Sequence, residues 1–367
     1  MNVLMSTTVF TGSKYYRMAE PARAVQEAGL GVDVTVTRGL STTMVPSPDG
    51  TELVVQAVDA QGADVVVLQL PKTEAMLQCL RLLQAQGVAV VVEMDDLLSA
   101  VPYGHIGHAG LVRQGMDRHA LACAREADLV TVSTPALLQE YASHGRGVVI
   151  PNAIPRRVAE LPPAYARDPE ELTIGWTGSV ATHPYDLQVM ESGLQQALDR
   201  TRGRSRFVIL GQADDAKDRL RLAEEPTVVP WVRDVVEYTG TVGELFDIGL
   251  APLRDDRFNT SKSWLKVLEY AARGIYAVRS PSAEYERLGL GRRARSPRDW
   301  ATFITSGIEN PDRRRELAAA DREKVLAGHL TEHTAEAWVA AWRQARDNRA
   351  RSRRVGAPAS RPQAVLA

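Results

Sequence analysis

The chain has 367 residues, more than a single hydrophobic core usually holds, so we expect two domains. Its 44 Lys and Arg residues are balanced by 45 Asp and Glu residues, which argues against an overall attraction to nucleic acid or to an anionic membrane. The two cysteines, Cys79 and Cys123, lie in apolar helical patterns and have no metal-like pairing. They indicate core thiols in a reducing compartment rather than a disulfide.

The N-terminal segment MNVLMSTTVF lacks the basic start and the long apolar run of a signal peptide. No apolar stretch in the sequence reaches the length that spans a membrane. We therefore expect a cytoplasmic protein, with peripheral attachment to a membrane left open.

Short valine-rich runs alternate with helix-length segments through the first 150 residues. The runs are apolar on both faces, which is typical of parallel strands covered by helices on both sides. We predict strands at 3–5, 32–36, 65–70, 89–94, 129–133 and 148–150, and helices at 15–28, 73–86, 111–126 and 135–143. This alternation predicts a doubly wound α/β domain over residues 1–152.

Five prolines fall between residues 151 and 171, and we assign 153–171 as a linker. The alternation restarts in residues 172–330, with strands predicted at 172–176, 207–210, 227–229, 248–251 and 276–278. Two Rossmann-like domains joined in this way enclose a cleft, with the carboxyl edge of each sheet facing inward. We expect a helix at 331–350 that caps the second domain or crosses back to the first, and a disordered tail at 351–367.

The segment from Asp247 to Val278 carries the strongest functional signal. A short strand is followed by a polar loop and then by a predicted helix whose first turns hold Ser261, Lys262 and Ser263. The N-terminus of a helix offers free backbone N–H groups and a partial positive charge, and a lysine adds a full one. This combination suits a diphosphate.

One stripe of the same predicted helix is polar, with Lys262, Lys266, Glu269 and Arg273 at helical spacing. A solvated face with Lys266 and Glu269 as a spaced ion pair is the alternative interpretation. The chain has only six lysines, so two of them on one face favour a site over a background of charge.

The second domain opens with IGWTGSVATHPYDL, a strand that turns through Gly178 and Ser179 into a helix expected near Pro184. Glycine permits close approach of a ligand to the backbone, Ser179 can donate to a phosphate oxygen, and His183 can lie beside that phosphate. A plain strand-to-helix turn with a surface histidine is the alternative.

In the first domain, TGSKYYR at 11–17 brings glycine, serine and cations to the end of the opening strand. The strand at 89–94 is followed by Asp95 and Asp96, and then by His105 and His108. Paired acids in this place can bind Mg²⁺ or Mn²⁺, can accept a hydrogen bond or a proton from an acceptor hydroxyl, or can cap a turn. The two histidines lack a third ligand, so no zinc site is predicted.

Several motifs that would indicate other classes of enzyme are missing from the sequence. It has no G-x-G-x-x-G after the first strand, no G-x-x-x-x-G-K-[ST] and no G-x-S-x-G. These gaps argue against a nicotinamide or flavin dehydrogenase, a P-loop nucleotide hydrolase and an α/β-hydrolase.

Three segments of the second domain carry a family likeness: IGWTGS at 174–179, VEYTGTVGELFDIGLAPL at 236–253 and FNTSKSWLKVLEYAARGIYAV at 258–278. Together they resemble the GT-B glycosyltransferases, most closely the family-4-like group (glycosyl transferases group 1), which takes a sugar from a nucleotide diphosphate. The first domain matches more loosely, through EMDDLL at 93–98. The resemblance implies a GT-B fold and a UDP-sugar or GDP-sugar donor, with no further cofactor.

The resemblance also implies residue roles. Glu269 stands at the terminal glutamate of the family's Glu, seven residues, Glu pattern and would contact the donor ribose, whereas Ser261 replaces the first glutamate. Lys262 and Lys266 would hold the diphosphate, and the backbone at 230–233 would lie near the nucleobase. The donor-binding set that we predict is Gly12, Ser13, Gly178, Ser179, His183, Trp231, Asn259, Ser261, Lys262, Ser263, Lys266 and Glu269.

Breaking the bond between sugar and phosphate leaves negative charge on the diphosphate, which Lys262 can stabilise without a metal. Asp95, Asp96 and His105 are expected to approach the acceptor, with Tyr16, Arg17 and His108 on the acceptor side. The family resemblance implies retention of the anomeric configuration.

Two other functions stay open. One is a metal-dependent glycosyltransferase that uses Asp95 and Asp96, and the other is a non-catalytic two-domain protein that closes on a ligand. The acceptor can be a glycan, a lipid-linked or small molecule, or modified DNA, and no obligate protein partner is indicated. A basic run from Arg343 to Arg354 is either a solvated helix end or a contact for a polyanion such as DNA or an anionic membrane.

Overall fold

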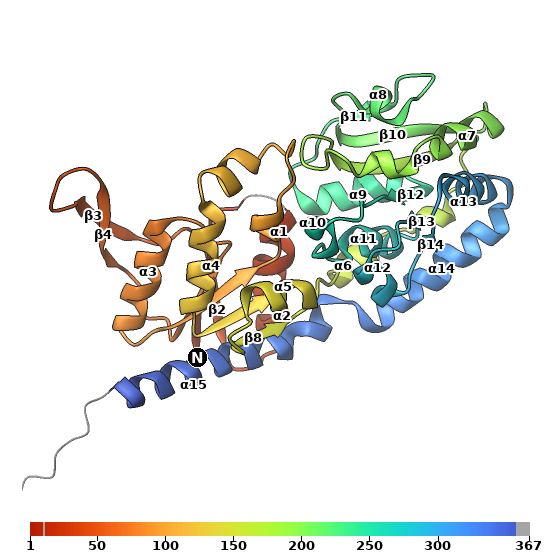
Figure 1. Cartoon of the computed structure of the whole chain (residues 1–367). Coiled ribbons are helices and arrows are strands. Elements are labelled where there is room, and N and C mark those ends of the chain that lie inside the picture. Colours follow the sequence, from red (N-terminus) through yellow and green to blue (C-terminus); the bar gives the residue numbers. More distant parts are fainter. Residues whose placement is uncertain (10–11, 357–367) are drawn as a thin grey trace, which may run out of the picture.

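The computed structural model describes residues 1–9 and 12–356, which contain two six-stranded parallel sheets side by side (Figure 1). The first has the order β2-β1-β5-β6-β7-β8, with β1 Asn2–Thr7, β2 Asp33–Arg38, β5 Val65–Gln69, β6 Ala89–Met94, β7 Leu129–Val132 and β8 Gly147–Val149. The second has the order β11-β10-β9-β12-β13-β14, with β9 Leu172–Ser179, β10 Ser205–Gln212, β11 Thr227–Val229, β12 Ile248–Ala251, β13 Tyr276–Arg279 and β14 Arg292–Arg293. The predicted fold class, two doubly wound α/β units with a C-terminal helix, is confirmed.

The inner strands of each sheet are buried on both faces, which explains the continuous apolar runs in the sequence. Alternate residues of β6 enter different hydrophobic clusters: Val90 and Val92 pack on one face, and Ala89 and Val91 pack on the other. A strand that is covered on both sides needs apolar residues at every position. The strands could therefore be located from composition alone.

Two helices of the first unit, α3 and α5, begin where the sequence supplies a cap. Thr73 and Thr134 each accept a hydrogen bond from a backbone N–H three residues on, at Met76 and Leu137. The helical segments are α1 Gly12–Lys14, η1 Tyr15–Ala19, α2 Glu20–Glu27, α3 Glu74–Ala85, η2 Leu98–Ala100, η3 Ala109–Arg113, α4 Met116–Glu126 and α5 Pro135–Tyr141. A hairpin that we did not predict, β3 Thr42–Pro46 with β4 Leu53–Val58, projects from this unit (Figure 1).

Two helix predictions in the second unit are wrong. No helix begins at Pro184, because β9 runs on to Ser179 and turns precede the short η5. The helix expected to carry Ser261 to Ser263 is two pieces, α10 and α11, and Lys262 lies in the turn between them. The helical segments are α6 Arg156–Ala159, η4 Ala164–Ala166, η5 Leu187–Met190, α7 Gly193–Arg200, α8 Ala216–Leu220, α9 Val235–Leu245, α10 Arg257–Thr260, α11 Leu265–Ala272, α12 Ala283–Leu288, α13 Pro297–Glu309 and α14 Pro311–Gly328.

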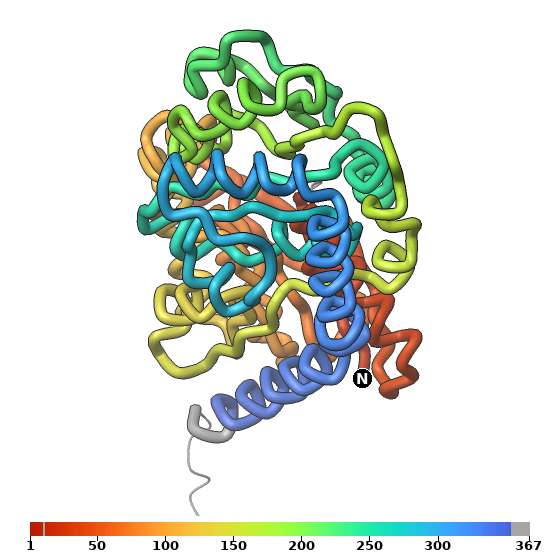
Figure 2. The backbone as a smooth tube through the Cα atoms, turned by 90° about the vertical axis from the view of Figure 1, so that its right-hand side faces the viewer, coloured from red at the N-terminus to blue at the C-terminus, as the bar shows by residue number. Residues whose placement is uncertain are grey.

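The C-terminal helix α15, Ala335–Gly356, follows the short η6 Thr331–Thr334 and runs along the first unit. Figure 2 shows the blue helices as one path that descends from the second unit to the first. Trp338 and Trp342 of α15 are buried in the same cluster as Val3 and Met5 of β1. Residues 351–356 are helical rather than part of a disordered tail, and 357–367 lie outside the described residues.

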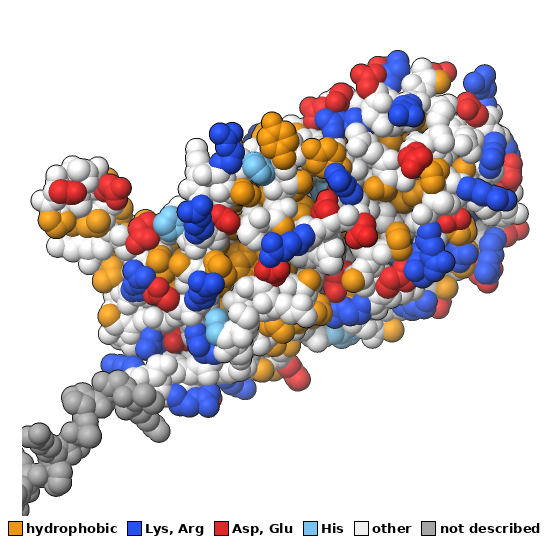
Figure 3. All heavy atoms as spheres, in the orientation of Figure 1, with side chains coloured by type: hydrophobic (Ala, Val, Ile, Leu, Met, Phe, Trp, Pro, Cys, Tyr) orange, Lys and Arg blue, Asp and Glu red, His pale blue; other side chains and the backbone are white. Residues whose placement is uncertain are grey.

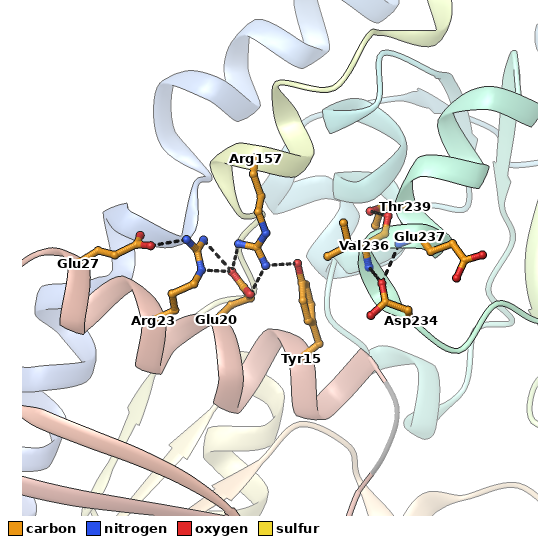
Figure 4. Close-up of polar contacts among 9 residues, drawn as sticks. All are labelled: Tyr15, Glu20, Arg23, Glu27, Arg157, Asp234, Val236, Glu237 and Thr239. Atoms are coloured by element: carbon orange, nitrogen blue, oxygen red, sulfur yellow. Dashed lines mark hydrogen bonds and ion pairs between the residues drawn. The ribbon is translucent and has the colours of Figure 1, made fainter.

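A network of charges joins the first unit to the proposed linker (Figure 4). Arg157 of α6 donates to the buried carboxylate of Glu20 at 2.7 Å and to the Tyr15 hydroxyl at 2.8 Å. Arg23 donates to the same carboxylate at 3.0 Å. Because Glu20 is almost inaccessible to solvent, these bonds fix the linker against α2.

None of the helices in the described ranges has the length and apolarity needed to cross a membrane.

Candidate active site

A cavity of about 230 Å³ lies between the two units at the carboxyl ends of their strands. Ligands in open α/β folds bind at this edge, outside the ends of the parallel strands. The lining residues are Ser13, Tyr16, Arg17, Asp95, Asp96, Asn152, His183, Leu253, Lys262, Ser263, Leu265, Lys266, Glu269 and Tyr285. The structure therefore brings together most of the side chains that the sequence nominated from both domains.

The first-unit wall is a chain of hydrogen bonds that ends on Asp95. Gln69 donates to the Ser13 hydroxyl at 2.9 Å, and Ser13 donates to Oδ2 of Asp95. Oδ1 of Asp95 is inaccessible to solvent and has no hydrogen-bond partner among the described residues. Burial, with the charge of Asp96 second, raises the pKa of Asp95 to about 6. This carboxyl can accept a hydrogen bond from a ligand, and sequence reasoning missed the Gln69 that supports it.

Arg17 lies deeper in this wall. Its Nε donates to Glu93 at 2.7 Å, and Nη1 donates to the side chain of Asn152 at 3.2 Å. The guanidinium also packs 4.9 Å from the ring centre of Trp338. In the described part of the chain its Nη2 is buried and without a partner. Most of the Arg17 guanidinium therefore contacts the protein itself, and only Nη2, which has no partner among the residues described, is left as a free donor beside the cavity.

The second-unit wall carries the two lysines. Nζ of Lys262 lies 2.6 Å from Oδ1 of Asp96, so a charge pair spans the cavity from one unit to the other. Nζ of Lys266 donates to the carbonyl of Thr177 and lies 5.1 Å from the ring centre of Trp176. Burial lowers the pKa of Lys266 to about 8, which leaves it mostly protonated at neutral pH.

Glu269 is buried, and it is one of the points where the two units meet through hydrogen bonds. Tyr16 of the first unit donates to Oε1 at 2.7 Å, and Tyr238 of α9 donates to Oε2 at 3.4 Å. Burial raises the pKa of Glu269 to about 7. Tyr16, predicted on the acceptor side, contacts the residue assigned to the donor, and Tyr238 was not anticipated.

His183 is held by an acid that sequence reasoning missed. Its Nδ1 lies 2.7 Å from Oδ2 of Asp186, yet burial lowers the pKa of the imidazole and favours its neutral form. Burial alone would raise the pKa of Asp186, but hydrogen bonds, first that of His183, keep it below its usual range. Asn259 donates to the same aspartate at 2.6 Å. Asn259 thus supports the site instead of lining the cavity.

Four other residues predicted to bind the donor do not line the cavity: they bond to nearby chain atoms or shape the backbone beside it. The Ser261 hydroxyl donates to the carbonyl of Phe258 at 2.7 Å and is buried, which turns it away from the cavity. Ser179 donates to Gln212 at 2.8 Å, and Gly178 has φ +149, where a Cβ would lie 2.9 Å from the Trp176 ring. Gly12 opens α1 and is not among the lining residues.

Three aromatic side chains predicted at the site lie outside the cavity lining. His105 accepts a hydrogen bond from the N–H of Gly107 at 2.8 Å, and burial, then the charge of Lys262, lowers its pKa. His108 packs edge-on to Tyr103 at 5.7 Å. Trp231 is half exposed and stacks on Tyr238 at 5.9 Å.

Arg273 does not face the cavity as its place on the helix stripe predicted. It is buried, and it donates to the carbonyl oxygens of Thr239 at 3.0 Å and of Pro162 in the proposed linker at 3.1 Å.

Within residues 1–9 and 12–356, no group of three or more His, Cys, Asp or Glu side chains is placed to hold a metal ion.

The basic run predicted near the C-terminus lies on α15. Arg349 pairs with Asp128 at 3.6 Å, whereas Arg343, Arg346, Arg351 and Arg353 are exposed. The side chain at position 354 falls outside the described part of the molecule. Contact with a polyanion stays a prediction.

Comparisons with known proteins agree with this architecture. The family described as glycosyl transferase-like matches residues 192–340. HepE of Anabaena, solved with UDP and glucose, has a TM-score of 0.62 at 14% identity over 93% of this chain and 98% of that chain. A glycosyltransferase of Rickettsia africae has a TM-score of 0.60 at 12% identity, with 94% and 98% covered. None of the curated proteins matches the sequence significantly.

A longer protein also shares the fold. A mutant of S. aureus TarM, solved with Fondaparinux, alpha-GlcNAc-glycerol and UDP, has a TM-score of 0.57 at 13% identity, covering 76% of this chain and 55% of that one. The chain thus spans about half the length of TarM. The match to the glycosyl transferase-like family is confined to residues 192–340, and the solved structures show that the chain shares their two-sheet GT-B fold.

Proposed function

We propose that the protein transfers a sugar from a nucleoside diphosphate sugar to an acceptor hydroxyl, with the donor in the cavity between the two units. The observation that carries this proposal is the pair of lysines on the second wall of that cavity, Lys262 and Lys266. Two ammonium groups on one wall suit a diphosphate. The structures of HepE and of TarM, both solved with UDP, support a uridine nucleotide as the first donor to test.

The charges along the cavity support a route by which a donor can bind. Lys262 is paired with Asp96, and its side chain is about a quarter exposed, at 23%. A diphosphate that replaces Asp96 as its partner keeps the lysine neutralised and frees a carboxylate on the opposite wall. Exchange of one partner for another costs less than the burial of an unpaired charge.

In the reaction that we propose, the acceptor oxygen forms a bond to the anomeric carbon while the bond from that carbon to the diphosphate oxygen breaks. The electron pair leaves on the diphosphate, where Lys262 and Lys266 stabilise it. For a retaining transfer, the hydroxyl proton passes to the departing diphosphate oxygen on the same face of the sugar. Asp95 accepts a hydrogen bond from the acceptor and orients it.

We also propose that the transfer needs no metal. The ammonium of Lys262 lies 2.6 Å from Asp96 and competes with any cation for that carboxylate. Ser13 already donates to the carboxylate of Asp95. Both acids that a metal-dependent enzyme would use therefore have partners from the chain itself.

A screen of UDP-sugars and GDP-sugars by thermal unfolding tests the proposal, because a ligand that binds only the native state raises the melting temperature. We expect at least one nucleotide sugar to raise it and to be hydrolysed or transferred slowly by the same preparation. A ligand that binds without any turnover would favour a non-catalytic binding protein.

A further inference from the structure

A second groove, of about 460 Å³, opens beside the cavity and is built by both units. It is lined by Ala100, Pro102, Tyr103, Tyr185, Arg254, Asp256, Arg257 and Phe258. The first three follow β6, and the others follow β9 and β12, so the groove also lies at the carboxyl ends of the strands. Figure 3 shows hydrophobic side chains on the surface where the two units meet.

The groove displays an aromatic ring on a backbone that the second unit holds in place. Tyr103 is 79% exposed, and its carbonyl accepts a hydrogen bond from the Tyr185 hydroxyl at 2.7 Å. Gly104 follows with φ +93, and a Cβ there would lie 3.0 Å from the same hydroxyl. The N–H of Ile106 donates across the junction to Ala181 at 3.0 Å. Exposed aromatic surface at a fixed place indicates a binding role.

The charges of the groove nearly cancel. Arg257 makes a bidentate pair with Glu140, with both bonds of one Nη at 2.8 Å, and Asp256 caps α10 through the N–H of Asn259. The guanidinium of Arg254 stacks 4.9 Å from the ring centre of Tyr185, and no carboxylate pairs with it in the described residues. Two stacked or exposed aromatic rings with a single available cation suit a neutral ligand rich in hydroxyls. They do not suit a polyanion, which needs several unpaired cations.

The groove adjoins the candidate active site. The Phe258 ring at its floor lies 4.3 Å from Nζ of Lys262, which lines the donor cavity. A smaller hollow between the two is lined by Tyr185 and Phe258 of the groove and also by His183 of the donor cavity. A chain molecule in the groove can therefore present its end to the place where Lys262 meets Asp96.

We propose that this groove binds the acceptor and that the acceptor is a neutral saccharide chain, whose sugar faces pack on Tyr103 and Tyr185 and whose hydroxyls meet Arg254. This inference rests on the proposed function, which it extends from the donor to the acceptor. Of the acceptors that the sequence left open, it favours a glycan over DNA, over a lipid-linked acceptor at an anionic membrane and over a small molecule, which would need no groove.

The test measures binding of the whole chain to an array of short, neutral, immobilised oligosaccharides, in the presence of UDP. We expect binding to at least one of them, and a loss of about tenfold in affinity for Tyr103→Ala, which removes a ring that stacks on the ligand. Arg254→Ala should weaken binding to the same oligosaccharides. The matched control is Leu53→Ala on β4, another exposed apolar side chain, at 64%, which should bind as the parent does.

The melting temperature of each variant, with and without UDP, keeps the two proposals separate. A chain whose melting temperature rises with UDP but which binds no neutral oligosaccharide overturns the acceptor proposal and leaves the donor site standing. Equal binding by Tyr103→Ala and the parent overturns it too, as does binding to vesicles of anionic lipid that Tyr103→Ala abolishes. If no nucleotide or nucleotide sugar shifts the melting temperature, the proposed function itself fails.

Discussion

The two walls of the cavity carry opposite charges, and burial moves each toward its neutral form. On the first wall, burial raises the pKa of Asp95 to about 6, and on the second it lowers the pKa of Lys266 to about 8. Between them, the less enclosed pair of Asp96 and Lys262 meets at 2.6 Å. The deep groups are thus shifted toward their neutral forms, whereas at the gap Lys262 can exchange Asp96 for a charged ligand.

The largest effect is expected from removing the cation at the gap. Lys262→Ala should lower turnover about 100-fold or more, because a preorganised charge on the leaving group contributes several kcal/mol to the transition state. Steady-state kinetics with the best nucleotide sugar would measure it. Lys324→Ala, on α14 and 60% exposed, is the matched control and should leave turnover unchanged. Near-normal turnover in Lys262→Ala would remove this residue from the proposed mechanism.

Substitution of Asp95 on the first wall should lower the transfer rate by less than Lys262→Ala does, and the effect should depend on pH. Asp95→Asn should lower transfer about tenfold, because the amide orients an acceptor hydroxyl less well than a carboxylate does. In the parent chain, kcat/KM should rise as the pH increases through about 6, where Asp95 loses its proton. A pH profile of the variant that keeps the same rise would assign it to another group.

The raised pKa of Asp95 also predicts how the free energy of unfolding depends on pH. Its pKa is higher in the folded protein than its ordinary value of 3.8, so its contribution is fully present below that value and is lost as the pH rises through about 6. The loss is on the order of 3 kcal/mol. Unfolding by urea at low and at neutral pH should show a smaller decline for Asp95→Asn than for the parent chain.

A weaker change is expected where the walls touch through Glu269. Tyr16→Phe removes the hydroxyl that donates to this carboxylate at 2.7 Å and should cost about 1 kcal/mol of stability. The KM for the donor should change only a few-fold, since Tyr238 still reaches Glu269. Tyr15→Phe is the comparison variant, because its hydroxyl bonds to Arg157 in the linker network instead (Figure 4). A donor KM that changes equally in both variants would mean that the contact between units, not Glu269, controls donor binding.

The smallest effect is expected from chelation. If the acid wall acts through hydrogen bonds, EDTA should leave the transfer rate unchanged, because Asp96 is neutralised by a lysine. If activity disappears with EDTA and returns with Mg²⁺ or Mn²⁺, Asp95 and Asp96 bind a metal ion, and the proposal of a metal-independent transfer is wrong.

Local pattern was enough for eleven of the twelve strands described in the two sheets, all but β14, and for the candidates on each wall. Strands buried on both faces are apolar at every position, so β5, β6 and β7 could be found within a residue or two from composition. Helix caps such as Thr73 and Thr134 are equally local. The hairpin of β3 and β4 was missed because its short runs lack the two-sided burial that marked the others.

The sequence by itself determined the doubly wound class, the two sets of strand-end loops and the residues Asp95, Lys262, Lys266 and Glu269 as candidates. Only the tertiary structure decided which of these meet and which supporting side chains join them: Gln69, Asp186 and Tyr238. Gln69 and Tyr238 act on residues that are distant along the chain, and Asp186 joins the nearby His183 to the distant Asn259, so periodicity could not reveal these contacts. The structure also turned Ser261 inward and Arg273 toward the linker, because a hydroxyl or a guanidinium satisfies whichever carbonyl the packed chain places beside it.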